Sequence, residues 1–143
     1  KVPCPIMMEQ ILQLEKALFE ASGGTPGIDL PVRHWFCKGL YGRELFIPAG
    51  TVLTGKIHRT EHLVIISQGV VSVTTEFEEL YIEAPYTMIT VPGTKRALYV
   101  HEDVVWTNIH ATTELDVSKI EEEIIAKSYD EFEFSDEGIK WRG

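Results

Sequence analysis

The sequence predicts an all-β jelly-roll barrel of about eight strands, preceded by a helix and followed by a helix with an acidic tail. Between residues 35 and 111, short runs rich in Val, Ile, Thr, Tyr and Phe alternate with turn-forming residues, which is typical of a sandwich or barrel. On either side of this stretch, apolar residues recur at helical spacing. We therefore divide the chain into residues 1–31 (helix and loop), 32–114 (barrel) and 115–143 (helix and acidic tail).

Both flanking helices are predicted from amphipathic patterns. Apolar residues from Ile6 to Phe19 repeat every three or four positions, and the Gly- and Pro-containing residues 21–31 end that pattern. A single helix of this length has too little apolar surface to fold alone, so we expect it to pack on the barrel or on a partner subunit. A second helical stripe runs from Val117 to Ile125, and the residues after 128 form a flexible or docking tail.

Turn signals separate the predicted strands. They include Gln68-Gly69, Ala84-Pro85, Pro92-Gly93 and Glu102-Asp103. Many short strands of this kind favour a barrel over a parallel α/β sheet. We expect strands at residues 45–48, 52–58, 62–67, 70–75, 80–83, 87–91, 97–100 and 104–110.

Composition and charge argue against several classes of function. The 143 residues carry 22 acidic against 13 basic side chains, a net charge of −9, which argues against a general nucleic-acid surface. No stretch reaches the roughly 20 apolar residues that span a bilayer, and no signal-peptide pattern opens the chain. Cys4 and Cys37 fit reduced thiols and have no assigned role. We expect an intracellular protein that is not secreted and binds neither membrane nor nucleic acid.

The residues best suited to chemistry lie between Gly55 and Gly69. His58 ends one predicted strand and His62 begins the next, so both imidazoles are expected to face the barrel interior. Strand alternation then places Lys56 inward as well. Two imidazoles facing one cavity suit a divalent metal such as Zn²⁺, Fe²⁺, Ni²⁺ or Mn²⁺.

A third imidazole is expected from the last predicted strand. There Trp106, Asn108 and His110 share one face, so His110 joins the other two histidines as a candidate metal ligand. Asn108 and Trp106, together with Tyr41, are candidates for contacts to a bound small molecule.

Charged residues near this cavity have candidate roles too. Lys56 and Arg96 need a counter-charge, because an unpaired buried charge is unfavourable. Either Glu44 or a neighbouring carboxylate supplies it, or the two cations neutralise an anionic ligand. The catalytic residues are unknown, with Glu44 and Glu61 as candidate acid or base. A plainer alternative stays open, in which the histidines are hydrogen-bonded turn residues and a one-residue shift in register turns both cations toward water.

Two stretches resemble the metal-binding motifs of the cupin superfamily. The spacing of the first motif, His-x-His followed by Glu and Gly, is similar to that of Lys56, His58, His62 and Gly69, with Lys56 in the place of the first His and His62 in the place of the Glu. The second, Pro-x-Gly followed by His, is similar to residues 92–96, with Arg96 in the place of the His. Histidines thus hold two of the four ligand positions, and cations hold the other two. The resemblance implies a cupin-type jelly roll with a ligand cavity, which pairs into a homo-oligomer.

More narrowly, the chain resembles small cupin-like proteins of bacteriophage genomes over residues 32–126. No settled activity is known for this group, so the resemblance implies a phage protein in the host cytoplasm or on the virion. The matching segments are 34–36, 39–44, 47–51, 55–58, 61–63, 92–96 and 101–110.

Three functions are compatible with these observations. The first is binding of a divalent metal or a small anionic ligand in the barrel cavity, without established catalysis. The second is a metal-dependent oxygenase, isomerase or hydrolase that acts on a small polar substrate. The third is a structural or virion-associated module that assembles through its helix and tail. Whether the chain is an enzyme is left open.

Overall fold

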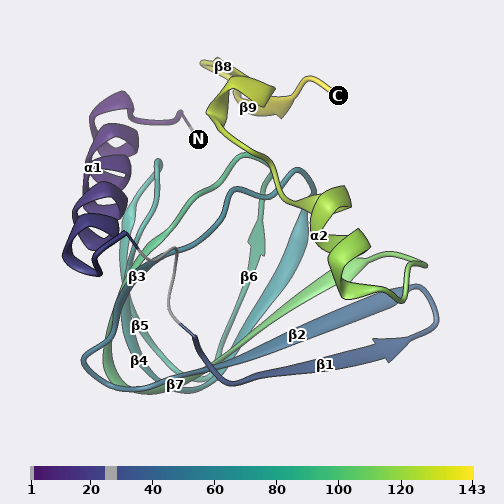
Figure 1. The fold of residues 1–143 in the computed structure, drawn as a ribbon. Coiled ribbons are helices and arrows are strands. Elements are labelled where there is room, and N and C mark those ends of the chain that lie inside the picture. Colours follow the sequence, from purple (N-terminus) through teal and green to yellow (C-terminus); the bar gives the residue numbers. More distant parts are fainter. Residues whose placement is uncertain (1, 25–28) are drawn as a thin grey trace.

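Seven antiparallel strands form one strongly curled sheet in the computed structural model, which describes residues 2–24 and 29–143 (Figure 1). The predicted all-β jelly-roll class is confirmed. The strands are β1 (Val32–Cys37), β2 (Leu40–Ile47), β3 (Val52–Thr54), β4 (His62–Thr74), β5 (Glu79–Glu83), β6 (Tyr86–Thr90) and β7 (Ala97–Ala111).

The two longest strands, β4 and β7, hold the barrel together. Over one half of their length, β2 pairs with β7 and β6 pairs with β4. Over the other half, β3 pairs with β7 and β5 pairs with β4. The sheet therefore folds over itself, and its inner faces enclose an apolar core that includes Ile47, Val64, Ile66, Val71, Val73, Ile82, Leu98, Val100, Val104 and Trp106.

The strands bend where the sequence predicts turns. Gln68-Gly69 and Glu102-Asp103 were expected to end strands, but β4 and β7 continue through them, so this prediction is wrong. The β4–β7 register shifts between Ile66 and Val71, which is a bulge, and bulges bend a strand without ending it.

Strand boundaries differ from prediction at two other places. Strands β1 and most of β2 were not predicted, because Gly and charged residues interrupt their pattern and the residues of β1 are largely exposed. The strand expected to reach His58 ends at Thr54 instead, and the backbone from Gly55 to Ile57 is irregular. His58 forms only an isolated bridge with Ile125.

Helix α1 (Pro5–Ala21) packs beside the barrel near β3, as one of the two predicted alternatives required (Figure 1). Ile11 is its fully buried residue, and Glu15 accepts a hydrogen bond from the Thr54 hydroxyl at 2.9 Å. Four residues of the predicted loop after this helix, 25–28, lie outside the described residues.

The C-terminal segment also docks on the barrel, with α2 (Val117–Ile124) across from α1 and the final hairpin between the two helices (Figure 1). Asp116 caps the N-terminus of helix α2, because its carboxylate accepts a hydrogen bond from Ser118 N. The helix buries Ile120 and Ile124. A short 3₁₀ turn, η1 (Tyr129–Glu131), leads into a hairpin of β8 (Phe132–Ser135) and β9 (Gly138–Trp141). The predicted tail is therefore a folded, docking segment.

Two further observations bear on the expected setting. In the part of the chain that the structure describes, no helix combines the length and apolar character needed to cross a membrane. Cys4 and Cys37 form no disulfide.

Candidate functional site

Three histidines from different parts of the chain meet inside the barrel. His62 begins β4, His110 lies near the end of β7, and His58 lies on the irregular segment before β4. Leu63 of β4 pairs with Ile109 of β7, so their chain neighbours His62 and His110 lie side by side on adjacent strands. The ring centroids are 4.4 Å apart for His62 and His110, and 4.6 Å apart for His58 and His62.

The ring nitrogens of these histidines are arranged as metal ligands are. His62 Nδ1 lies 3.2 Å from the carbonyl oxygen of Thr60, which can only accept a hydrogen bond, so Nδ1 carries the proton. The lone pair of His62 Nε2 is then free, and this buried atom has no hydrogen-bond partner. His110 Nδ1 is likewise buried without a partner. A backbone acceptor behind one ring nitrogen and a free lone pair on the other is the usual arrangement of a metal-ligating histidine.

Burial keeps the three imidazoles neutral. It lowers the pKa of His58 to about 2 and that of His110 to about 3, and it also lowers the pKa of His62. The neighbouring imidazoles lower the pKa of His58 further. Neutral imidazole is the form that binds metal, so no proton needs to be displaced at neutral pH.

The residues present fit a divalent transition metal. One nitrogen from each of the three rings lies within 4.8 Å of the others, and within the described residues this group contains no carboxylate or thiolate. Tetrahedral Zn²⁺ with Zn–N bonds of about 2.1 Å would need about 3.4 Å between ligand nitrogens. Movements of about 1 Å by these side chains would therefore close the site.

Arg96 faces the same interior, as predicted. Its Nη2 donates to the Thr90 hydroxyl at 2.7 Å, and Thr90 is the register partner of His62. Its guanidinium carbon lies 5.6 Å from the centre of the Trp106 ring, and its buried Nε has no hydrogen-bond partner. Burial lowers the pKa of Arg96 to about 10, so it stays charged at neutral pH.

Arg43 also faces the interior, and the sequence analysis did not assign it to the site. It pairs with the buried Asn108, and directly opposed residues point to the same face of a sheet. The signal was available, because Tyr41, Arg43, Leu45 and Ile47 alternate in the period of a half-buried strand. The predicted strand begins only at residue 45 and therefore leaves Arg43 out.

Three predicted site residues lie outside this cluster. Lys56 is exposed, so the prediction that it points inward is wrong, because the irregular backbone after Thr54 breaks the alternation. Glu44 faces outward opposite Thr107, and its carboxylate accepts a hydrogen bond from Trp35 Nε1. Glu61 is exposed in the turn before β4. Neither candidate acid or base therefore reaches the histidines.

The other predicted cavity residues lie beside the cluster. Asn108 and Trp106 are buried on the face of β7 that carries His110, as alternation required. The Asn108 amide oxygen accepts a hydrogen bond from Trp106 Nε1 at 3.3 Å, and no hydrogen bond of ordinary geometry joins it to His62 Nε2. Tyr41 is 1% exposed, and its ring lies 6.2 Å from that of His110.

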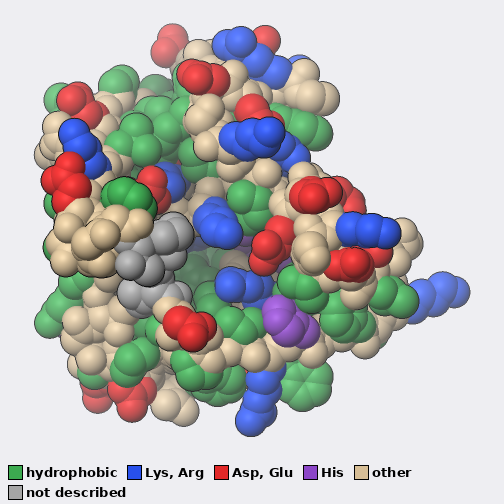
Figure 2. All heavy atoms as spheres, in the orientation of Figure 1, with side chains coloured by type: hydrophobic (Ala, Val, Ile, Leu, Met, Phe, Trp, Pro, Cys, Tyr) green, Lys and Arg blue, Asp and Glu red, His purple; other side chains and the backbone are tan. Residues whose placement is uncertain are grey.

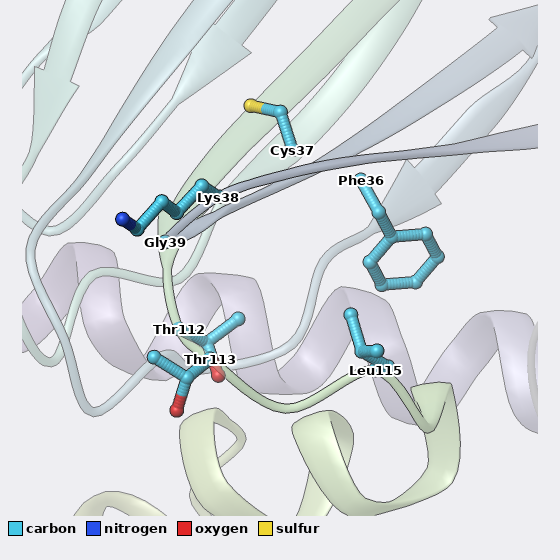
Figure 3. A pocket seen from close by; sticks show the side chains of 7 residues that line it. All are labelled: Phe36, Cys37, Lys38, Gly39, Thr112, Thr113 and Leu115. Atoms are coloured by element: carbon cyan, nitrogen blue, oxygen red, sulfur yellow. The ribbon is translucent and has the colours of Figure 1, made fainter.

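A cavity of about 310 Å³ lies at one end of the barrel beside Phe36, whose ring stacks on that of Tyr41 (Figure 3). Figure 3 shows that the β1–β2 turn and the connection from β7 to α2 line it, with Phe36, Lys38 and Leu115 among the lining side chains. It contains no histidine, and its charged lining residue, Lys38, is exposed. We therefore place the chemistry at the histidine cluster instead.

A second residue that sequence reasoning missed is Glu76. This carboxylate, in the turn between β4 and β5, is fully buried and accepts hydrogen bonds from Lys95 N and from the Tyr129 hydroxyl. Burial raises its pKa. Nothing in the local sequence distinguishes it from the exposed acidic residues nearby, such as Glu79.

Comparison with solved structures agrees with the fold. A putative ethanolamine utilization protein Q from Salmonella typhimurium LT2 is 9% identical, with a TM-score of 0.51 over 61% of this chain and 72% of its own. The cupin domain of Cnp3 from Schizosaccharomyces pombe is 17% identical, with a TM-score of 0.50 over 71% of this chain and 77% of its own. No protein-family model and no curated protein sequence matches the chain.

The fold therefore places this chain among proteins with the cupin-type jelly roll. At such low identities the likeness establishes the fold alone, because one fold hosts many unrelated functions. What the barrel does has to be argued from its own residues.

Proposed function

We propose that the barrel binds a divalent transition metal through His58, His62 and His110, and that it binds a small ligand beside the metal. The observation that carries the proposal is the pair of buried ring nitrogens, His62 Nε2 and His110 Nδ1, that have no hydrogen-bond partner. Leaving such atoms unpaired is costly unless something binds them. Three protein ligands would leave a coordination position for water or a ligand, and a metal held by these histidines would supply a Lewis acid.

Metal content of the purified, untagged protein tests the proposal. We expect near-stoichiometric metal by mass spectrometry, and its loss in His62→Ala and His110→Ala, because each removes one of three ligands. His101→Ala is the matched control, since His101 is exposed on another part of the barrel, where its Nε2 forms a hydrogen bond of 2.7 Å with the Ser72 hydroxyl. A parent protein that stays metal-free after reloading with Zn²⁺, Fe²⁺, Ni²⁺ and Mn²⁺ would overturn it.

The remaining expectations stay predictions. An enzyme acting on a small polar substrate needs an acid or base near the metal, and neither Glu44 nor Glu61 lies there. We therefore favour binding without a stated reaction. The phage origin and the homo-oligomer inferred from sequence resemblance also stay predictions, and sedimentation velocity would measure the oligomeric state.

A further inference from the structure

We propose that the ligand of this barrel is a small anion, a carboxylate or a phosphate, held by Arg43 and Arg96 beside the histidine cluster. The inference rests on the metal-binding function proposed above and adds to it the chemical class of the ligand. It follows from the position of the two guanidinium groups and from the absence of a carboxylate that pairs directly with them among the described residues.

Arg96 has an unused hydrogen-bond donor. Its Nη2 is occupied by the Thr90 hydroxyl, but Nε is buried and unpaired. The charge of Glu76 acts on Arg96, yet Glu76 Oε2 accepts hydrogen bonds from Lys95 N and Tyr129, and Oε1 has no hydrogen-bond partner. Glu76 therefore offsets part of the Arg96 charge at a distance without hydrogen bonding to it.

The Arg43 guanidinium has fewer polar contacts than that of Arg96. No hydrogen bond or ion pair joins it to another described residue, although it is half-buried opposite Asn108. It lies close enough to His58 and His110 for its positive charge to act on both. Its neighbour in the chain, Glu44, cannot neutralise it because the two side chains point to opposite faces of β2.

Two guanidinium groups and three neutral imidazoles give this part of the barrel an excess of positive charge. A metal ion would add to that excess, and buried charges are unfavourable unless an opposite charge compensates them. An anion bound to both arginines satisfies this requirement. Arginine also suits this task because its planar donors match the oxygens of carboxylates and phosphates.

A cavity lies on one side of Arg96. Arg96 and Thr90 line a cavity of about 370 Å³ whose other walls include Leu80, Tyr86 and Met88. Glu78 and Glu137 also line it, whereas Arg43 and the three histidines do not. Figure 2 shows that the face between α1 and α2 is hollowed near its centre, with Lys or Arg side chains and an Asp or Glu side chain at the edge of the hollow. The cavity therefore gives a ligand access to Arg96, and it is the two arginines themselves that favour an anion.

The test follows the arginine Nε–H signals by ¹H–¹⁵N NMR while acetate, inorganic phosphate or neutral acetamide is added to the zinc-loaded protein. We expect saturable shifts with at least one anion and none with acetamide. Arg43→Gln and Arg96→Gln should each weaken anion binding by about tenfold or more, because each removes one charged donor group. The preferred anion distinguishes a carboxylate ligand from a phosphate ligand.

Arg33→Gln is the matched control, because Arg33 lies on the outer side of the barrel, with its guanidinium 5.4 Å from the centre of the Phe46 ring. Circular dichroism checks folding, and Arg96→Lys replaces Arg96→Gln if the latter unfolds. Equal binding of acetamide, or unchanged anion affinity in the arginine variants, would overturn the inference. Metal content is measured on the same samples. Arginine-dependent anion binding without metal would overturn only the metal-binding function, and metal without anion binding would overturn only this inference.

Discussion

Single residues decide whether this barrel can bend and whether it can bind. His62 directs one ring nitrogen to a backbone carbonyl and leaves the other free, so its orientation is set before any ligand arrives. Gly69 has an equally local role at the bend of β4. Its φ is +98°, and a Cβ built there would lie 2.2 Å from the carbonyl oxygen of Asp103. The close approach of β4 and β7 at the bend therefore requires glycine.

Replacing Gly69 by Ala should destabilise the fold by about 3 kcal/mol, since the positive φ is strained and the backbone of Asp103 must also move. Urea unfolding measures the change. Gly50→Ala is the matched control: its φ is +87°, but nothing lies within 4 Å of the added Cβ, so a loss of only about 1 kcal/mol is expected. Equal losses in the two variants would contradict the role given to the close contact.

At the scale of elements, the C-terminal segment closes one side of the site. The bridge between His58 and Ile125 and the hydrogen bond from Arg59 N to Ile124 O join it to the chain next to the cluster. Glu131 holds the segment in place, because its carboxylate forms an ion pair with Arg59 at 2.8 Å and also accepts a hydrogen bond from Lys127 N. Tyr41 packs against Ile120 and Ile124, so α2 also covers the ring beside His110.

The docking of this segment should weaken in acid. The hydrogen bond from Arg59 lowers the pKa of Glu131 to about 2, so the folded form releases this proton more readily than the unfolded chain, whose Glu pKa is about 4.3. The stabilisation is present above about pH 4.3 and is lost as the pH falls toward 2. The protection of the β8–β9 amides against hydrogen exchange, measured by mass spectrometry relative to the unfolded chain at the same pH, should therefore fall across that range.

Glu131→Gln should show faster exchange of the same amides already at pH 7, because the charge that pairs with Arg59 is gone. Glu133→Gln is the matched control, since Glu133 lies two residues away on β8 and is exposed. Exchange in Glu131→Gln that matches the parent at pH 7 would show that the apolar contacts of Ile57, Ala126 and Phe132 hold the hairpin by themselves.

At the scale of the whole molecule, Glu76 joins three separate parts of the chain. Its backbone carbonyl accepts from Cys4 N at 2.6 Å, just before α1. Its side chain accepts from Lys95 N in the β6–β7 connection and from Tyr129 in the C-terminal segment. Lys95 in turn forms an ion pair with Glu15 of α1 at 2.6 Å. Both ends of the chain are thus tied to the barrel at one buried point.

Glu76→Ala should lower the free energy of unfolding by about 3 kcal/mol, because it leaves two donors without their acceptor in a buried place. Tyr129→Phe removes one of those hydrogen bonds and should cost about 1 to 2 kcal/mol. Urea unfolding measures both. The effects of the two changes should not add in the double variant, since the residues share one contact. Glu79→Ala, at an exposed position, should change the free energy by less than about 0.5 kcal/mol.

The sequence by itself determined the all-β class, the two helices and the set of three histidines. These depend on short-range periodicity, in which alternation along one strand placed Trp106, Asn108 and His110 together and helical spacing located α1 and α2. Such patterns are visible locally because they repeat every two or about 3.6 residues.

Only the tertiary structure decided the charges around the site. Lys56 turned outward because the strand before it ends early, and Arg43 entered the site through its pairing with β7, 65 positions further along at Asn108. The burial of Glu76 depends on Cys4, Lys95 and Tyr129, which no local pattern brings together. The free energy of a buried charge depends on its surroundings in three dimensions, and those surroundings come from distant segments that only the folded chain places side by side.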